Sequence, residues 1–222
     1  MNKLSAPYKA LALFAVTLLA TSAAHATVLY SNGPYNGQGA PSSAPNITDG
    51  NYAKDSFTIG TSSTVTGIEF VSWNYPPGNT IVSVDWAIFS GLPVPYTASP
   101  LIASGTGVVT STFLLDHSAG GYDVYSDTFD ITGLALSSGT YSLGLYDALA
   151  GTHSDDLRWD TNGGPSIAVI HTNFGPFDGY GASQSFQVLG SSASTSVAEP
   201  DTLGLMALGL VLVGFATRRR RQ

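Results

Sequence analysis

Several stretches of this chain alternate apolar and polar residues with a period of two. In residues 80–90, four apolar side chains fall on one side of an extended chain: Val82, Val84, Trp86 and Ile88. A β-strand places every second side chain on the same face, whereas a helix does not. Gly, Pro, Ser and Asn break the alternating stretches at short intervals, as they do between strands. We therefore expect short strands joined by tight turns, with Trp86 in the core.

The same alternation recurs through residues 27–189, and no helical period interrupts it. Residues 64–73, for example, place Ile68 and Phe70 on one face and Glu69 on the other. The chain has no cysteine, so its core alone must hold it together. These features predict an all-β fold, an antiparallel two-sheet β-sandwich of the jelly-roll kind. The expected strands are residues 27–31, 55–59, 64–73, 80–90, 101–103, 107–114, 122–131, 140–147, 166–171 and 185–189.

Charge is unevenly distributed. Between residues 27 and 196 the chain has two basic residues, Lys54 and Arg158, against thirteen acids, a net charge of −11. Twelve of these acids are Asp, which favours turns over helices. Phosphate binding needs clustered Lys and Arg, so nucleic acid is excluded as a partner. Cations and neutral sugars remain as ligand classes.

The end of the chain has the composition of a membrane anchor. Residues 203–217 contain no charged side chain. As a transmembrane helix they would cover roughly 22 Å of a hydrocarbon core about 30 Å thick. The arginines that follow predict a cytoplasmic C-terminus. The apolar segment is preceded by Val197, Ala198, Glu199 and Pro200, and followed by Arg218, Arg219, Arg220 and Arg221.

This order of acidic motif, apolar helix and basic end resembles the PEP-CTERM sorting signal of Gram-negative bacteria. Glu199 and Pro200 match the end of the family's Pro-Glu-Pro motif, and Ala198 stands where the family has its first proline. The resemblance implies that an exosortase processes the chain at the inner membrane and that the product reaches the cell surface or extracellular matrix. Hydropathy alone leaves an ordinary single-pass anchor as the alternative.

The first 26 residues have the features of a signal peptide. Lys3 and Lys9 form a positive start, residues 10–20 are apolar, and Ala24-His25-Ala26 fits a cleavage site. Two export signals at opposite ends predict an exported protein. The expected organisation is a signal peptide at residues 1–26, a β-sandwich domain at 27–189, a flexible spacer at 190–196 and the sorting signal at 197–222.

Three segments within the domain carry a second resemblance. Residues 83–88, 121–125 and 159–166 are similar to segments of a group of PEP-CTERM carriers that have no assigned activity. This resemblance supports the sandwich fold. It implies no reaction.

One acidic loop is a candidate calcium site. Asp155, Asp156, Asp160 and Asn162 offer oxygen ligands within eight residues, and two glycines follow them. Calcium prefers carboxylate and carbonyl oxygens, so it is the one cofactor that the sequence suggests. The alternative is a turn in which Asp and Asn side chains bond their own backbone.

Two tryptophans are candidates for ligand binding. Trp159 stands inside the acidic loop, and Trp73 precedes a Pro-Pro-Gly turn. An exposed indole could stack on a sugar ring, whereas a strand tryptophan more often belongs to the core.

Catalytic residues are not apparent. The chain has no G-x-S-x-G elbow and no H-E-x-x-H zinc motif. Glu69 and Asp85 could supply the two carboxylates of a glycosidase if their strands bring them within about 5–10 Å. Asp116 with His117, and His153 with the aspartates of the acidic loop, could each form a catalytic acid–base pair. Solvated polar residues of a loop explain both groups better. The prediction is that the protein is not an enzyme.

The function that these features favour is that of an exported, non-enzymatic surface or extracellular-matrix protein associated with exopolysaccharide. Its expected partners are an exosortase-type processing enzyme and extracellular polysaccharide, with only a transient stay in the inner membrane. Three alternatives remain open: a calcium-assisted carbohydrate-binding module, a glycan hydrolase and an ice-binding protein.

Overall fold

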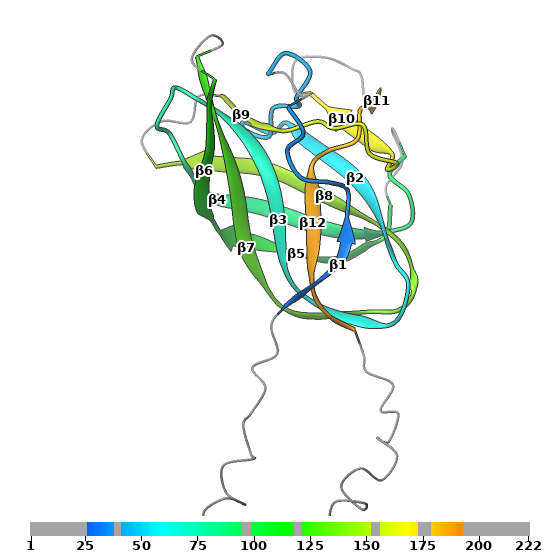
Figure 1. Cartoon of the computed structure of the whole chain (residues 1–222). Coiled ribbons are helices and arrows are strands. Elements are labelled where there is room, and N and C mark those ends of the chain that lie inside the picture. Colours follow the sequence, from blue (N-terminus) through cyan, green and yellow to red (C-terminus); the bar gives the residue numbers. More distant parts are fainter. Residues whose placement is uncertain are drawn as a thin grey trace, which may run out of the picture.

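A computed structural model describes residues 26–37, 41–94, 99–117, 121–151, 156–172 and 179–192 (Figure 1). Regular structure in these residues consists of β-strands in two antiparallel sheets, which confirms the all-β, two-sheet prediction. None of the described segments forms a helix long and apolar enough to cross a membrane. The predicted signal peptide, the apolar segment 203–217 and the sorting residues lie outside the described residues.

Sheet A has six strands, in the order β1-β12-β3-β7-β6, with β9 also paired to β3. Both of its longest strands, β3 and β7, lie in its middle. The strands are β1 (Thr27–Ser31), β12 (Phe186–Ser192), β3 (Ser63–Tyr75), β7 (Tyr122–Leu136), β6 (Thr110–His117) and β9 (Asp156–Trp159).

Sheet B also has six strands, in the order β11-β10-β2-β8-β4-β5. It forms the second layer of the sandwich in Figure 1. The strands are β11 (Gly179–Gly181), β10 (Ala168–His171), β2 (Tyr52–Ile59), β8 (Gly139–Ala150), β4 (Ile81–Ser90) and β5 (Leu101–Val108).

The inner faces of the two sheets meet in one apolar core. Trp86 is only 7% exposed, which confirms its predicted place. Ile68 and Phe70 point inward and Glu69 outward, also as predicted. Other members of the core are Val65, Phe129, Phe186 and Val188 from sheet A, and Ala53, Phe57, Val84, Ile88, Leu143 and Leu145 from sheet B.

Irregular pairing explains where the predicted alternation was wrong. Val82 is exposed, whereas its neighbour Ile81 is buried. The pairing of β4 with β8 shifts register on both sides of Ser83, and a one-residue shift moves a side chain to the other face of a sheet. The sequence also did not predict β9 and β11.

Strand β5 is longer than the predicted residues 101–103 because its glycines make room for large neighbours. A Cβ at Gly107 would lie 2.6 Å from the Phe129 ring, and one at Gly105 would lie 3.2 Å from the Trp86 ring. Glycine in a strand therefore marks close approach here rather than a strand end. The expected strand 107–114 is divided at Val109 between β5 and β6.

A second, smaller apolar cluster lies on the outer face of sheet A. Val71, Trp73 and Val124 are buried there with Ala44, and Tyr35 packs edge-on against Trp73 with ring centroids 5.9 Å apart. Ala44 and Tyr35 belong to the connection between β1 and β2. We call the described residues 32–37 and 41–51 of this connection the cover segment, because they shield this face of sheet A.

Candidate functional site

The described members of the predicted calcium site do not converge. Asp156 begins β9 and Asp160 follows its end, so the two carboxylates are separated by roughly 13 Å of extended chain. Within the described ranges, no three His, Cys, Asp or Glu side chains are grouped so that they could hold a metal ion. Asp155 lies outside the described residues. The three described oxygen donors, Asp156, Asp160 and Asn162, therefore do not fit a single calcium ion.

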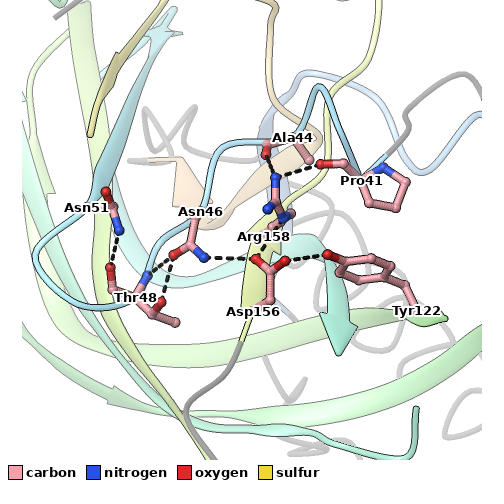
Figure 2. Close-up of polar contacts among 8 residues, drawn as sticks. All are labelled: Pro41, Ala44, Asn46, Thr48, Asn51, Tyr122, Asp156 and Arg158. Carbon is pink, nitrogen blue, oxygen red and sulfur yellow. Dashed lines mark hydrogen bonds and ion pairs between the residues drawn. The ribbon is translucent and has the colours of Figure 1, made fainter. Parts of the chain in front are cut away.

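Asp156 binds protein donors (Figure 2). One carboxylate oxygen accepts hydrogen bonds from Arg158 Nε at 2.7 Å and Asn46 Nδ2 at 2.8 Å. The other oxygen accepts one from the Tyr122 hydroxyl. Burial, and then the bond to Asp156, raise the pKa of Tyr122, which keeps this hydroxyl protonated as a donor. We call these four residues the latch.

The latch holds the cover segment against sheet A. Arg158 Nη1 donates to the backbone oxygens of Pro41 at 2.8 Å and Ala44 at 3.2 Å (Figure 2). The side-chain oxygen of Asn46 accepts bonds from the backbone N–H and hydroxyl of Thr48, each at 2.7 Å. The guanidinium, the only one in the domain, is thus used to fix a loop.

Asp160 lies in the interior, with no exposed surface. Its carboxylate accepts a 2.7 Å hydrogen bond from Trp73 Nε1 and another from the Ser185 hydroxyl. Burial raises the pKa of Asp160, and these hydrogen bonds oppose the rise. This side chain joins β3 to the segment before β12.

Neither predicted tryptophan can stack on a ligand from solution. Trp73 and Trp159 are both fully buried. Trp159 packs in the main core and donates its indole N–H to the Ser185 backbone oxygen at 3.1 Å. The structure corrects the prediction that these indoles bind a ligand. Both rings serve packing, because their faces meet aromatic neighbours and their N–H groups find internal acceptors.

Two further buried carboxylates were not predicted as special. Asp55 and Asp127 have no exposed surface, and burial raises the pKa of each to about 6. The hydroxyls of Ser72 and Ser111 donate to Asp127. The sequence did carry a signal for Asp127, because alternation places it on the same face as Phe129.

Asp55 is held by both backbone and side-chain donors. It accepts hydrogen bonds from the N–H of Gln184 at 2.6 Å and of Ser56 at 2.7 Å, and from the Ser166 hydroxyl at 2.8 Å. Asn32, at the start of the cover segment, donates to Ser166 and to the Gln184 backbone oxygen. This network ties β2 to the chain before β12 and does not reach the surface hollows described below.

The carboxylate pair considered for a glycosidase is not formed. Glu69 lies on the outer face of sheet A, where it accepts a 3.0 Å bond from Ser126. Asp85 lies on the outer face of sheet B and accepts from Thr106. Packed sheets are about 10 Å apart, so carboxylates on opposite outer faces cannot flank one glycosidic bond. Asp116 is exposed on β6, and His153 lies outside the described residues.

The outer face of sheet B carries an open depression of about 290 Å³, which we call the trough. Burial, and then the nearby charge of Asp85, raise the pKa of Tyr146 on its wall, so this hydroxyl stays protonated. The lining of the trough combines aromatic rings, small residues and one cation. The lining residues are Tyr52 and Lys54 from β2, Gly144 and Tyr146 from β8, Ala87 and Phe89 from β4, and Leu101 and Ser104 from β5.

Lys54 lies across this trough. Its Nζ is 4.9 Å from the centre of the Tyr52 ring and 4.4 Å from that of Phe89. Tyr52 also stacks on His171, with ring centroids 4.6 Å apart and planes inclined by 10°. The sequence pattern did not suggest this site, because its residues come from four strands that only the folded pairing brings together.

The outer face of sheet A has a hollow of about 370 Å³, the sheet A hollow. Leu114 and Leu115 form one side, and Pro34 and Tyr35 of the cover segment form another. Its polar groups include Glu69 and Ser126, which bond each other.

Comparison with models of protein families gives a match at the C-terminal tail. Residues 196–221 match the model of the PEP-CTERM protein-sorting motif. The chain carries a PEP-CTERM sorting motif. This motif implies an extracellular protein that a membrane-associated exosortase sorts to the cell surface. No curated protein and no solved structure matches the chain.

Proposed function

We propose that the protein is an exported, non-enzymatic surface or matrix protein whose β-sandwich associates with extracellular polysaccharide. The signal peptide at residues 1–26 directs export. The helix at residues 203–217 then holds the chain in the inner membrane until an exosortase removes it. The PEP-CTERM motif at residues 196–221 is the observation that carries this proposal.

The strand order supports a jelly-roll sandwich as the exported domain. In sheet A the last strand, β12, lies between β1 and β3, and in sheet B β8 lies between β2 and β4. Successive strands β1 to β4 thus alternate between the two sheets, as the Greek-key windings of a jelly roll require. Such a sandwich offers two broad outer faces for binding.

The surroundings of the carboxylates support binding rather than hydrolysis. Glu69 and Asp85 lie on opposite outer faces, and Asp156 is bound by Arg158, Asn46 and Tyr122. A retaining or inverting glycosidase needs two carboxyl groups facing one cleft. The trough offers aromatic rings and donors instead, which suits recognition of a sugar without its cleavage.

The processing step is tested in a host that encodes an exosortase. Intact-mass measurement of the secreted protein should find a product without Arg218 to Arg221. Glu199→Gln combined with Pro200→Ala should leave the tail attached and the protein with the membrane, because both motif residues are lost. Asp201→Asn, which removes a charge beside the motif, should be processed normally. A secreted wild-type product that retains its arginines would refute the proposal.

Association with polysaccharide is tested separately. The secreted protein should sediment with exopolysaccharide purified from the same culture, and enzymatic digestion of that polysaccharide should return the protein to the supernatant. A protein that stays in the supernatant at every polysaccharide concentration would contradict association while leaving the export step intact.

A further inference from the structure

We infer that the trough on the outer face of sheet B binds a neutral hexopyranose unit of a glycan, with Lys54 donating to its hydroxyls. This inference rests on the proposed function, since it names the ligand class and the site for the polysaccharide association. It follows from the shape of the trough, the arrangement of its aromatic rings and its charge.

Small residues make the trough floor. The strand pairing aligns Lys54 with Gly144 and Gly144 with Ala87, so these three lie in one row across β2, β8 and β4. A Cβ at Gly144 would lie 3.4 Å from the Phe89 ring and 3.5 Å from Lys54 Cγ. The absence of a side chain at Gly144 therefore lets the Phe89 ring and the Lys54 stem lie close above the floor.

Aromatic rings stand on both sides of this floor. Tyr52 is paired with Tyr146 in the row on one side, and Phe89 belongs to the row on the other side. Each row is two residues from the floor, or roughly 7 Å along the strands. Aromatic rings offer flat apolar faces, and the C–H groups of a pyranose ring present a matching surface. The volume of about 290 Å³ limits the ligand to a short part of a glycan.

Polar groups in the trough match hydroxyl groups. The Lys54 ammonium brings three N–H donors between the Tyr52 and Phe89 rings. The protonated Tyr146 hydroxyl and the exposed Ser104 are further partners. Sugar hydroxyls can accept a hydrogen bond from an ammonium group, whereas apolar side chains cannot.

Charge favours a neutral sugar over an acidic one. Residues 27–196 have a net charge of −11, and Asp85 lies in the row of Tyr52 and Tyr146 beside the trough. A uronic acid residue would bring its carboxylate towards Asp85 and into a strongly negative domain. The single cation in the trough, Lys54, does not offset that field.

The position of the trough suits a ligand outside the cell. β1 and β12 pair side by side, with Thr27 opposite Gly190, so the start of the domain and its link to the sorting tail share one end of the sandwich (Figure 1). The end of β2 lies near this end of the sandwich. Its last residue, Ile59, is four residues before Ser63, and Ser63 pairs with Ser192. Lys54 is five residues further along β2, or roughly 17 Å away. The trough is thus remote from the attachment point.

The test uses the protein as purified from its host, whether or not its tail has been removed, so that it does not depend on processing. Calorimetry measures binding of cellotetraose, mannotetraose, galactotetraose and tetragalacturonate. We expect at least one neutral tetrasaccharide to bind. Gly144→Val, which fills the floor, and Tyr146→Ala, which removes a wall, should each weaken binding at least tenfold.

Two control variants match these changes. Gly133→Val places the same side chain at an exposed strand glycine of sheet A, and Phe113→Ala removes an aromatic ring that is 53% exposed there. Both should bind as the wild type does, and thermal melting should show all four variants folded. Binding of tetragalacturonate alone, no binding of any probe, or binding that the trough variants do not alter would each overturn the inference. Tail processing and sedimentation with the host polysaccharide could still hold in those cases.

Discussion

The two outer faces of the sandwich contain similar residues, but these residues have different roles. On sheet A, the cover segment buries Trp73 and Val71, and Arg158 fastens that segment through Asp156. On sheet B, aromatic rings flank an open trough that contains the domain's other cation, Lys54. The difference shows that an aromatic residue or a charge indicates function only when the fold leaves it accessible to a ligand.

The two cations make the contrast clear. Arg158 donates to a carboxylate and to two backbone oxygens of a loop, so its hydrogen-bonding capacity serves the fold. Lys54 rests against two aromatic rings of the trough, at the place where we propose that a sugar binds. We therefore assign stability to the covered face and binding to the open face.

The largest expected effect concerns the covered face. Trp73→Ala should lower the free energy of unfolding by about 3–5 kcal/mol, because it leaves a large cavity and takes the indole donor from Asp160. Tyr146→Ala on the open face should cost about 1 kcal/mol or less. Urea unfolding of the two variants measures the difference. Equal losses would remove the distinction between the faces.

The next largest effect on stability concerns two of the buried carboxylates, Asp55 and Asp127. A pKa raised from 3.8 to about 6 means that the folded state holds its proton more tightly than the unfolded state. The stabilising contribution of these two groups should therefore be fully present below about pH 4 and be lost as the pH rises to about 6. Each group contributes on the order of 3 kcal/mol to this loss.

Replacing each carboxylate by an amide should separate them. Asp127→Asn should raise stability at pH 7 and reduce the pH dependence, because the Ser72 and Ser111 hydroxyls can turn to accept from an amide. Asp55→Asn should lower stability, since its amide group would face the fixed backbone N–H of Ser56 or Gln184. Urea unfolding between pH 4 and 8 measures both. A wild type whose stability rises across that range would contradict the expected direction.

Replacing either of the two cations, Arg158 or Lys54, should have a smaller effect on stability. Arg158→Ala should cost about 1.5–3 kcal/mol, because it removes a charge-assisted bond and leaves the Pro41 and Ala44 oxygens without their donor. Lys54→Ala should cost about 1 kcal/mol or less. Hydrogen exchange should accelerate in residues 41–51 of the first variant only. Unchanged protection there would show that the latch does not hold the cover segment.

Local sequence pattern predicted most of the strands and much of the core. The faces of Ile68, Phe70 and Trp86 follow from alternation, because a buried sheet face fixes the register of a strand. Val82 was placed on the wrong face because a register shift beside Ser83 depends on the neighbouring strand β8. Such shifts leave no mark in a single strand's pattern.

The site was harder to predict because its contacts are distant in sequence. Asp160 lies 87 residues from the Trp73 indole that it binds, and Asp156 lies 110 residues from Asn46. Counting oxygen donors along one loop therefore suggested a calcium site where the described donors serve separate contacts. The trough, too, exists only through the pairing of four strands. Gly144 lies in the trough because β8 pairs with β2 on one side and with β4 on the other.

The most direct test of the contrast between the faces is amide chemical-shift mapping of the isotopically labelled protein with the neutral tetrasaccharide that binds best. We expect shift changes at Lys54, Ala87 and Gly144, with none around the sheet A hollow at Leu114 and Leu115. Changes centred on the sheet A hollow, or no changes at saturating sugar, would contradict the assignment of binding to the open face.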